Sequence, residues 1–263
     1  MYRPLMIRLA LFATILIAQG GAQAADMTAR QVTEALVSAQ PDRPPDFSRK
    51  DLSFLDLSDL DFKRANLAGA NLYGVDLSDA NLSGANLSGA TLDHTTIIRT
   101  NFAGANLSGA SVFAPAAFST LEPSRAEAPD FAGADLSGAR IMARLSQAEM
   151  RGANFAHARM GIARDQLKTA VRNDLSDCGL SGADFSGADL KEVVFTFARL
   201  SAADFSGANL RGADLSHADL TGANLAGADL TEADLDETVL KNAKNVDQAK
   251  HLDTVRHRDR VIY

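Results

Sequence analysis

The stretch LSHADLTGANLAGADL (residues 215–230) places leucine at every fifth residue. A single α-helix advances about 100° per residue, so this spacing would scatter the leucines around its axis. In one continuous strand the same leucines would point alternately to opposite faces, because successive side chains do so. Neither regular element explains a period of five, and a different local geometry must repeat with it.

The period of five extends over most of the chain. Every fifth residue is apolar in three runs, at residues 52–112, 131–160 and 175–240, with a slip of one residue between Ile141 and Leu145. Alanine is common two residues before each apolar centre, and Asp or Asn is common one residue before it. The chain is therefore built from tandem copies of one short unit.

A tandem A-[D/N]-[L/F]-x-x pattern resembles that of the pentapeptide-repeat family, over roughly residues 46–243. The resemblance implies an all-β solenoid, a right-handed quadrilateral β-helix in which each unit forms one side and four units complete a coil. Every fifth residue then meets the central axis, which accounts for the leucines. The core positions that we expect on this axis include Leu67, Leu87, Leu107, Phe185, Phe205 and Leu225.

Stacked coils place residues twenty apart in one column, at the usual strand spacing of about 4.8 Å. We expect a column of Asn66, Asn86 and Asn106, and we expect the ring of Phe185 to stack on that of Phe205. Because each coil contacts only its neighbours, stability should be nearly additive along the rod.

Residues 1–24 resemble a signal peptide, with two arginines, an apolar stretch at residues 9–18 and an A-x-A site before Ala25. A retained membrane anchor is the alternative, which the shortness of the apolar stretch disfavours. No later segment approaches the roughly 20 apolar residues of a membrane helix, so we predict no transmembrane segment after signal removal. The predicted location is outside the cytoplasm, in the bacterial periplasm.

Both ends of the solenoid are predicted to be capped. Thr28 and Gln31 form a capping box that starts a helix, within an N-terminal cap and linker at residues 25–45. Apolar residues near Val246 indicate a short helix within a C-terminal cap and basic tail at residues 244–263. The tail is either a solvated charged end, which we favour, or a contact for a membrane or partner.

Two interruptions break the repeat between residues 46 and 243. Residues 113–129 contain three prolines, which cannot donate to a ladder, so we predict a loop there. Residues 161–173 are predicted to form a short helix. Phe113 and Phe118 are candidate partner contacts on the loop, unless the loop is a tolerated insertion whose Phe118 packs against the wall.

Charge is distributed unevenly along the chain. The net charge of −7 argues against nucleic-acid binding, and residues 174–240 carry thirteen acidic residues against three basic ones. One acidic wall could bind a basic partner, but the repeat alone also generates acidic columns, and we favour this second explanation. The candidate contacts on this wall are Asp184, stacked near Asp204, and Asp214, stacked near Asp234.

No catalytic motif is present: the sequence lacks G-x-S-x-G, H-E-x-x-H, C-x-x-C and P-loop patterns. We therefore predict no catalytic residue, no cofactor and no metal site. The histidines at positions 94, 157 and 217 should point outward on separate coils, with His217 beside Glu237. Cys178 occupies an inward position and should be a buried, unreactive thiol.

These observations predict a non-catalytic exported scaffold or protein-interaction module that presents a rigid, partly acidic wall and a protruding loop. The predicted partner is another protein, and pairing between copies of the rod is left open. The alternative is a DNA mimic that binds a nucleic-acid enzyme such as gyrase, as some members of the family do, although a signal peptide would separate it from cytoplasmic enzymes. A hydrolase that uses the loop has no residue constellation to support it.

Overall fold

Each five-residue unit owes its shape to a tight turn. In one such unit, Leu67 is buried, Gly69 has a positive φ of 64°, and the amide of Ala70 donates to the carbonyl of Leu67 at 3.0 Å. Asn66 fixes the turn, because its Oδ1 accepts a hydrogen bond from the amide of Ala68 at 3.2 Å. This geometry explains why Asp or Asn precedes the centre and why glycine often follows it by two residues.

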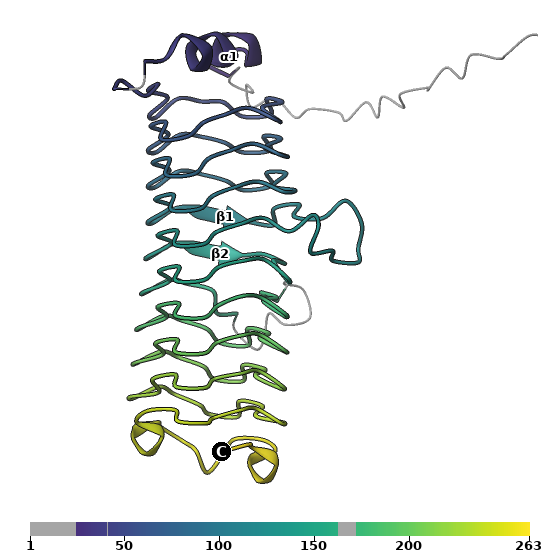
Figure 1. The fold of residues 1–263 in the computed structure, drawn as a ribbon, viewed down its shortest axis with the longest axis vertical. Helices are drawn as coiled ribbons and strands as arrows, with labels where there is room; N and C mark the ends of the chain where they lie inside the picture. Colours follow the sequence, from purple (N-terminus) through teal and green to yellow (C-terminus); the bar gives the residue numbers. More distant parts are fainter. Residues whose placement is uncertain (1–24, 41, 163–171) are drawn as a thin grey trace, which may run out of the picture.

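In the regular parts of the rod, parallel backbone bridges join each unit to the unit twenty residues later. They link Asn66 to Asn86 and Asn86 to Asn106, as the sequence predicts, and Asn86 Nδ2 donates to Asn66 Oδ1 at 3.2 Å. Four units therefore complete a coil, and the stacked coils form the rod in Figure 1. The right-handed sense of the winding stays a prediction. The computed structural model describes residues 25–40, 42–162 and 172–263.

The four sides of the rod are named A to D after the bridged residues that run along them. Side A carries Asn66, Asn86, Asn106, Asp184 and Asp204; side B carries Asn71, Ser111, Arg140, Arg159 and Asp189; side C carries Asp76, Asp174, Asp214 and Asp234; side D carries Asn81, Asn101, Gly179 and Arg199. Sides A and C lie opposite each other, as do sides B and D, because two units separate them within a coil of four.

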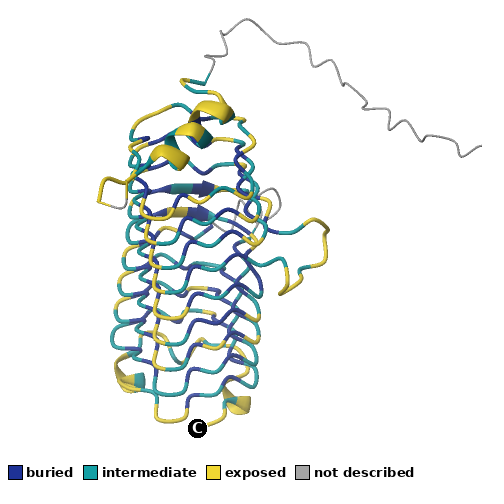
Figure 2. Ribbon diagram, turned by 45° about the horizontal axis from the view of Figure 1, so that its top comes forward, coloured by how far each residue is buried: buried dark blue, intermediate teal, exposed yellow. Residues whose placement is uncertain are grey.

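The core runs along the axis of the rod. The four leucines and two phenylalanines expected there are all buried, and buried positions recur in every coil in Figure 2. The rings of Phe185 and Phe205 are stacked, with centroids 5.1 Å apart and planes 3° apart. Phe155 stacks on the other face of Phe185, with ring centroids 4.9 Å apart. Phe195 packs edge-on against the rings of both Phe185 and Phe205.

A helix covers the first coil, as the capping box predicts. Helix α1 (Ala29–Ser38) begins after Thr28, whose Oγ1 accepts from the Gln31 amide at 3.3 Å while Gln31 Oε1 accepts from the Thr28 amide at 2.8 Å. Val32 is buried and joins the core cluster, and α1 lies across the end of the rod in Figure 1. The helix thus shields an edge that would otherwise present unpaired strand backbone.

The first interruption starts later than the predicted loop at 113–129. Phe113 still belongs to the wall, in strand β1 (Ser111–Phe113), which pairs in parallel with β2 (Arg140–Met142). Ala117 is still buried, so the loop that projects from the rod in Figure 1 begins after it. The predicted boundary is too early because a proline removes only its own backbone amide from the ladder, so Pro115 stays in the wall and is buried.

One buried side chain closes the one-residue slip that the sequence shows after β2. The coil at this point has 19 residues in place of twenty. Asn173, which is 1% exposed, accepts from the Ala143 amide at 2.7 Å and donates to the carbonyls of Ile141 and Met160 at 2.9 and 2.5 Å. Its amide group therefore substitutes for ladder bonds that the missing residue would make.

The C-terminal segment forms a further coil, in which the predicted short helix is reduced to 3₁₀ turns. Lys244 and Lys250 both bridge to the coil before them, which leaves room between them only for one 3₁₀ turn, η2 (Val246–Gln248). A second 3₁₀ turn, η3 (Arg258–Arg260), follows, and both turns lie at the lower end of the rod in Figure 1. The proposed signal peptide lies outside the described residues, as does most of the helix predicted at 161–173.

Candidate functional site

The four candidate aspartates do not form one acidic wall. Asp184 and Asp204 share a column on side A, whereas Asp214 and Asp234 share a column on side C. Within each column the stacking is as predicted, but the two columns lie on opposite sides because two units separate them in a four-unit coil. The expectation of a single flat acidic wall built from these residues is therefore wrong.

The aspartate side chains are engaged by the repeat itself. Asp184 Oδ1 accepts from the Ser186 amide at 2.8 Å. Asp204 Oδ1 accepts from the Ser206 amide at 2.8 Å and from Asn224 Nδ2 at 3.0 Å. These bonds fix the turns, as a side-chain oxygen at this position does elsewhere. They support the interpretation that the acidity is a by-product of repetition, and a role of the aspartates in partner contact stays a prediction.

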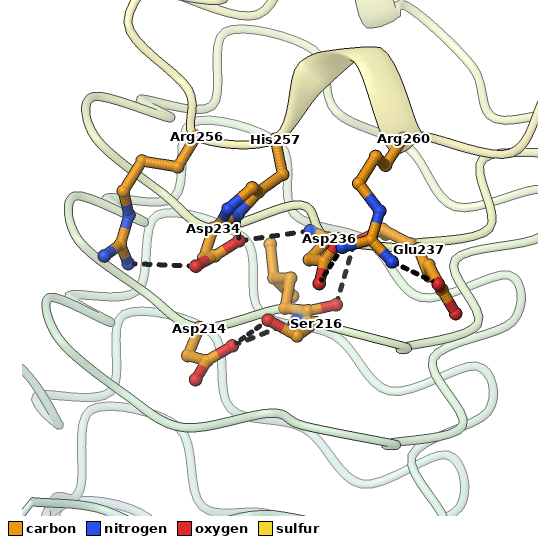
Figure 3. A network of polar contacts seen from close by, with 10 residues as sticks. Asp214, Ser216, Asp234, Asp236, Glu237, Arg256, His257 and Arg260 are labelled. Carbon is orange, nitrogen blue, oxygen red and sulfur yellow. Dashed lines mark hydrogen bonds and ion pairs between the residues drawn. The ribbon is translucent and has the colours of Figure 1, made fainter.

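The basic tail clasps the preceding coil and is not a freely solvated end (Figure 3). His257 Nδ1 lies 2.8 Å from Asp234 Oδ1, and Arg256 lies 3.5 Å from the other oxygen of the same carboxylate. Arg260 donates to Asp236 at 3.0 Å and also pairs with Glu237. The tail therefore neutralises acidic groups at the end of side C; its basic residues are exposed, as expected of a solvated end, but three of them are paired with carboxylates.

The contact between the tail and side C shifts the pKa values of Asp234 and His257. Burial raises the pKa of Asp234, but hydrogen bonds from His257 and the Asp236 amide outweigh it and hold the pKa below its ordinary value of 3.8. The hydrogen bond to Asp234 raises the pKa of His257 above its ordinary value of 6.5. Both shifts favour the charged pair.

The two candidate phenylalanines have different surroundings. Phe118 is partly buried and packs against the core cluster, in agreement with the tolerated-insertion alternative. Phe113 is 43% exposed, but it belongs to β1 and lies beside His94, with ring centroids 5.6 Å apart. The structure therefore separates Phe113, which is on the wall, from the loop on which we predicted it.

Phe113 is the last rung of an exposed aromatic ladder, defined as Phe54, Tyr73, His94 and Phe113. Successive ring centroids are 5.4, 5.2 and 5.6 Å apart, and successive ring planes cross at 62–70°. The rungs follow side B bridge residues on four successive coils, and Phe54 is 74% exposed. Gly74 makes room for the first rung, since a Cβ there would lie 2.9 Å from the Phe54 ring. Four rings thus form a continuous aromatic strip on the surface.

A shallow pocket of about 330 Å³ continues this strip along the same side. We call it the arginine pocket; its lining residues are Asp93, Ser111, Phe113, Arg140, Ile141, Met142, Arg159 and Gly161. Arg140 and Arg159 are bridged neighbours on side B, so they stand one coil spacing apart. Among the described residues, neither guanidinium has a hydrogen-bond or ion-pair partner. The pocket therefore combines apolar walls with cationic groups that are available to a ligand.

The remaining candidate groups do not assemble into a reactive centre in the described parts of the chain. His217 Nδ1 lies 3.2 Å from Glu237 Oε2, as predicted, and its ring stacks on Phe197 at 4.6 Å. Cys178 is fully buried, its thiol donates to the Leu145 carbonyl at 3.0 Å, and burial raises its pKa. Within the described ranges, no three His, Cys, Asp or Glu side chains gather as a metal site would require.

The helices in the described part of the chain are short. None of them is long and apolar enough to cross a bilayer.

Comparison with known families settles the origin of the repeat. The family model for pentapeptide repeats matches the chain over residues 46–84, 76–112, 174–212 and 208–244, with eight copies. The chain belongs to the pentapeptide-repeat family. The residues between the matched segments include both interruptions, where this pentapeptide-repeat protein departs from the regular unit. A search of curated proteins found no match.

Several solved structures match this chain, and one of them, HetL, resembles it in fold. HetL, involved in heterocyst differentiation regulation in the cyanobacterium Nostoc, is 24% identical, with a TM-score of 0.53 over 90% of this chain and 100% of its own. QnrB1, a plasmid-mediated fluoroquinolone resistance protein, is 19% identical over 81% of this chain and 88% of its own, with a TM-score of 0.39. A thylakoid-lumen protein of Arabidopsis thaliana is 25% identical over 50% of this chain and 81% of its own, with a TM-score of 0.27. The likeness to HetL supports a β-solenoid and extends no further than the fold.

Sequence reasoning missed the aromatic ladder, although its signal was present. Aromatic residues and a histidine recur at positions 54, 73, 94 and 113, which is once per twenty-residue coil within one residue. The twenty-residue column predicts the contacts of the apolar centres, of the Asp or Asn positions and of the single turn pair His217 and Glu237. Applied to the two turn positions after each centre, it predicts that these rings meet.

Proposed function

We propose that this protein is a non-catalytic scaffold that binds another protein through side B of its rod. The observation that carries the proposal is the aromatic ladder, because exposed apolar strips of this kind on a soluble surface mark interaction sites. Phe, Tyr, Met and Arg are also the residue types enriched at interface cores, and side B combines all four types at Phe113, Tyr73, Met142 and Arg140.

The rigidity of the rod supports the same function. Each unit is tied to its neighbours by the backbone bridges and by turn-fixing side chains, so the ladder is held on a preformed surface. A preformed surface loses little conformational freedom on binding, which favours affinity. The DNA-mimic alternative gains no such support, because the candidate aspartates are divided between sides A and C.

We also propose that the protein acts after export, in the periplasm. The charged and apolar pattern of residues 1–24 supports this location. The test is cell fractionation followed by N-terminal sequencing. A mature chain that begins at Ala25 in the periplasmic fraction agrees with export, and an unprocessed cytoplasmic chain contradicts it.

The binding function is tested by chemical cross-linking and capture from an envelope extract. The ladder variant Phe54→Ser/Tyr73→Ser should lose a partner that the wild type retains. Phe197→Ser is the matched control, because Phe197 is also exposed and also has a φ of 60°, but it follows a side C bridge residue. Deletion of loop residues 118–128 should leave capture unchanged. Capture that survives the ladder variant and fails only without the loop would transfer the function from side B to the loop.

A further inference from the structure

We infer that the aromatic ladder and the arginine pocket form one docking surface for an extended peptide segment of another protein, apolar at one end and acidic at the other. This inference rests on the proposed binding function and specifies the chemistry of the partner. The occupant lies along the rod, with its apolar side chains against Phe54, Tyr73 and His94 and its carboxylates against Arg140 and Arg159.

The two parts of the surface are continuous. Phe113 is both the last rung of the ladder and a wall of the arginine pocket. The three ring-to-ring steps of the ladder cover about 16 Å, and the two coils that carry Arg140 and Arg159 add about 5 Å each. An extended chain advances about 3.3 Å per residue, so a segment of about eight residues spans the whole surface.

The charge at the pocket end selects an acidic occupant. Arg140 and Arg159 stand in successive coils, and both guanidiniums are exposed. The acids nearby have other partners: Asp93 Oδ1 accepts from Ser111 Oγ at 2.7 Å and from the Phe113 amide at 3.0 Å, and Asp189 pairs with Lys191 at 3.2 Å. Paired arginines bind carboxylates in charge-assisted hydrogen bonds, which anchor an acidic segment here.

The ring geometry favours a peptide over a sugar chain. Successive ladder rings cross at 62–70°, so they do not share a plane on which consecutive sugar rings would lie flat. They leave edges and clefts between rings, which suit the separate apolar side chains of a peptide. Aromatic side chains and arginine are also the most frequent hot spots of protein interfaces.

The test is selection from a random octapeptide library displayed on phage, with the full mature chain as bait. Wild-type protein should enrich peptides with apolar residues in one half and Asp or Glu in the other. A synthetic enriched peptide should bind with an affinity that falls on raising salt from about 0.05 M to about 0.3 M. Arg140→Glu/Arg159→Glu should weaken that peptide at least about tenfold, as loss of a hot spot does.

Arg199→Glu is the matched control, because Arg199 is exposed and occupies the same position of the unit on side D. Its affinity for the peptide should equal that of the wild type, and circular dichroism should show that all variants keep their fold. No enrichment, enrichment that the double arginine variant retains, or binding of an acidic oligosaccharide in place of the peptides overturns the inference. If capture from the envelope extract still depends on the ladder in any of these cases, the proposed function survives and only the partner chemistry is wrong.

Discussion

Shortening one ring in the phenylalanine stack should destabilise the rod by an amount that the packing sets. Phe185 is buried between the parallel rings of Phe155 and Phe205, with centroid distances of 4.9 and 5.1 Å. A buried Phe→Ala change costs about 3–5 kcal/mol in lost transfer free energy and cavity formation. We place Phe185→Ala at the upper end, because ring pairs add about 0.5–1.5 kcal/mol beyond their buried area.

Phe185→Leu separates the ring contacts from the filling of space. Leucine occupies most centre positions of this chain, so the site accepts its shape. A hydrophobic exchange that nearly preserves volume costs less than about 1.5 kcal/mol, so this variant should retain most of the stability. The measurement is urea unfolding followed by far-ultraviolet circular dichroism, with the free energy of unfolding compared among the three proteins.

Hydrogen exchange gives the same prediction a spatial test. Because each coil contacts only its neighbours, faster exchange in Phe185→Ala should be confined to the coils that contain Phe155, Phe185 and Phe205. Equal losses for the alanine and leucine variants would assign the whole effect to the ring contacts and none to the cavity, and would refute this division. A uniform acceleration of exchange along the rod would refute nearest-neighbour coupling.

Three further perturbations follow from the structure. Asn173→Ala leaves the Ala143 amide and the carbonyls of Ile141 and Met160 without the hydrogen bonds that Asn173 makes. It should lower the free energy of unfolding, measured in urea titrations, by about 3 kcal/mol. A loss below about 1 kcal/mol would contradict the bridging role of Asn173. The pKa of Asp234 is lowered in the folded protein, so the stabilisation from its carboxylate is complete above pH 3.8 and is lost as pH falls through the folded-state pKa. The pKa of His257 is raised, so the stabilisation from its protonated ring is complete below pH 6.5 and is lost as pH rises through the folded-state pKa. The melting-temperature advantage of wild type over His257→Gln should therefore peak between about pH 4 and about pH 6.5, and a pH-independent difference would count against the clasp. Cys178 should react with a thiol reagent only at the rate of unfolding, whereas rapid labelling of the native protein would contradict its burial.

The regular part of the fold could be predicted because one local rule repeats. A turn after each apolar centre, fixed by Asp or Asn, ends one side of the coil and starts the next. Because four sides complete a coil, residues twenty apart lie in one column. The stacking of Phe185 on Phe205 follows from counting twenty residues, without any knowledge of long-range contacts. Solenoids allow this inference because contacts are confined to neighbouring coils.

The irregular part could not be predicted, because each break is closed by contacts that have no period. Nothing in the repeat indicates that Asn173 reaches three backbone groups across the slip. The loop boundary likewise depends on whether a proline can stay in the wall, which only the surrounding bridges decide. The C-terminal helix is shortened for a related reason: its apolar spacing is helical, but backbone bridges at Lys244 and Lys250 leave room only for the 3₁₀ turn η2.

Repetition also explains why function must be sought where the unit is violated. Asp or Asn before the centre fixes a turn through its side-chain oxygen, and an arginine has no oxygen with which to accept that bond. Arg140 and Arg159 nevertheless occupy this position on successive coils of side B. Proteins depart from local rules most often at functional sites, where the departure has another use. The exposed rings of Phe54 and Tyr73 are equally unnecessary for the turns that carry them. That two independent kinds of departure meet on one side of the rod, at Phe113, is the strongest reason to test side B first.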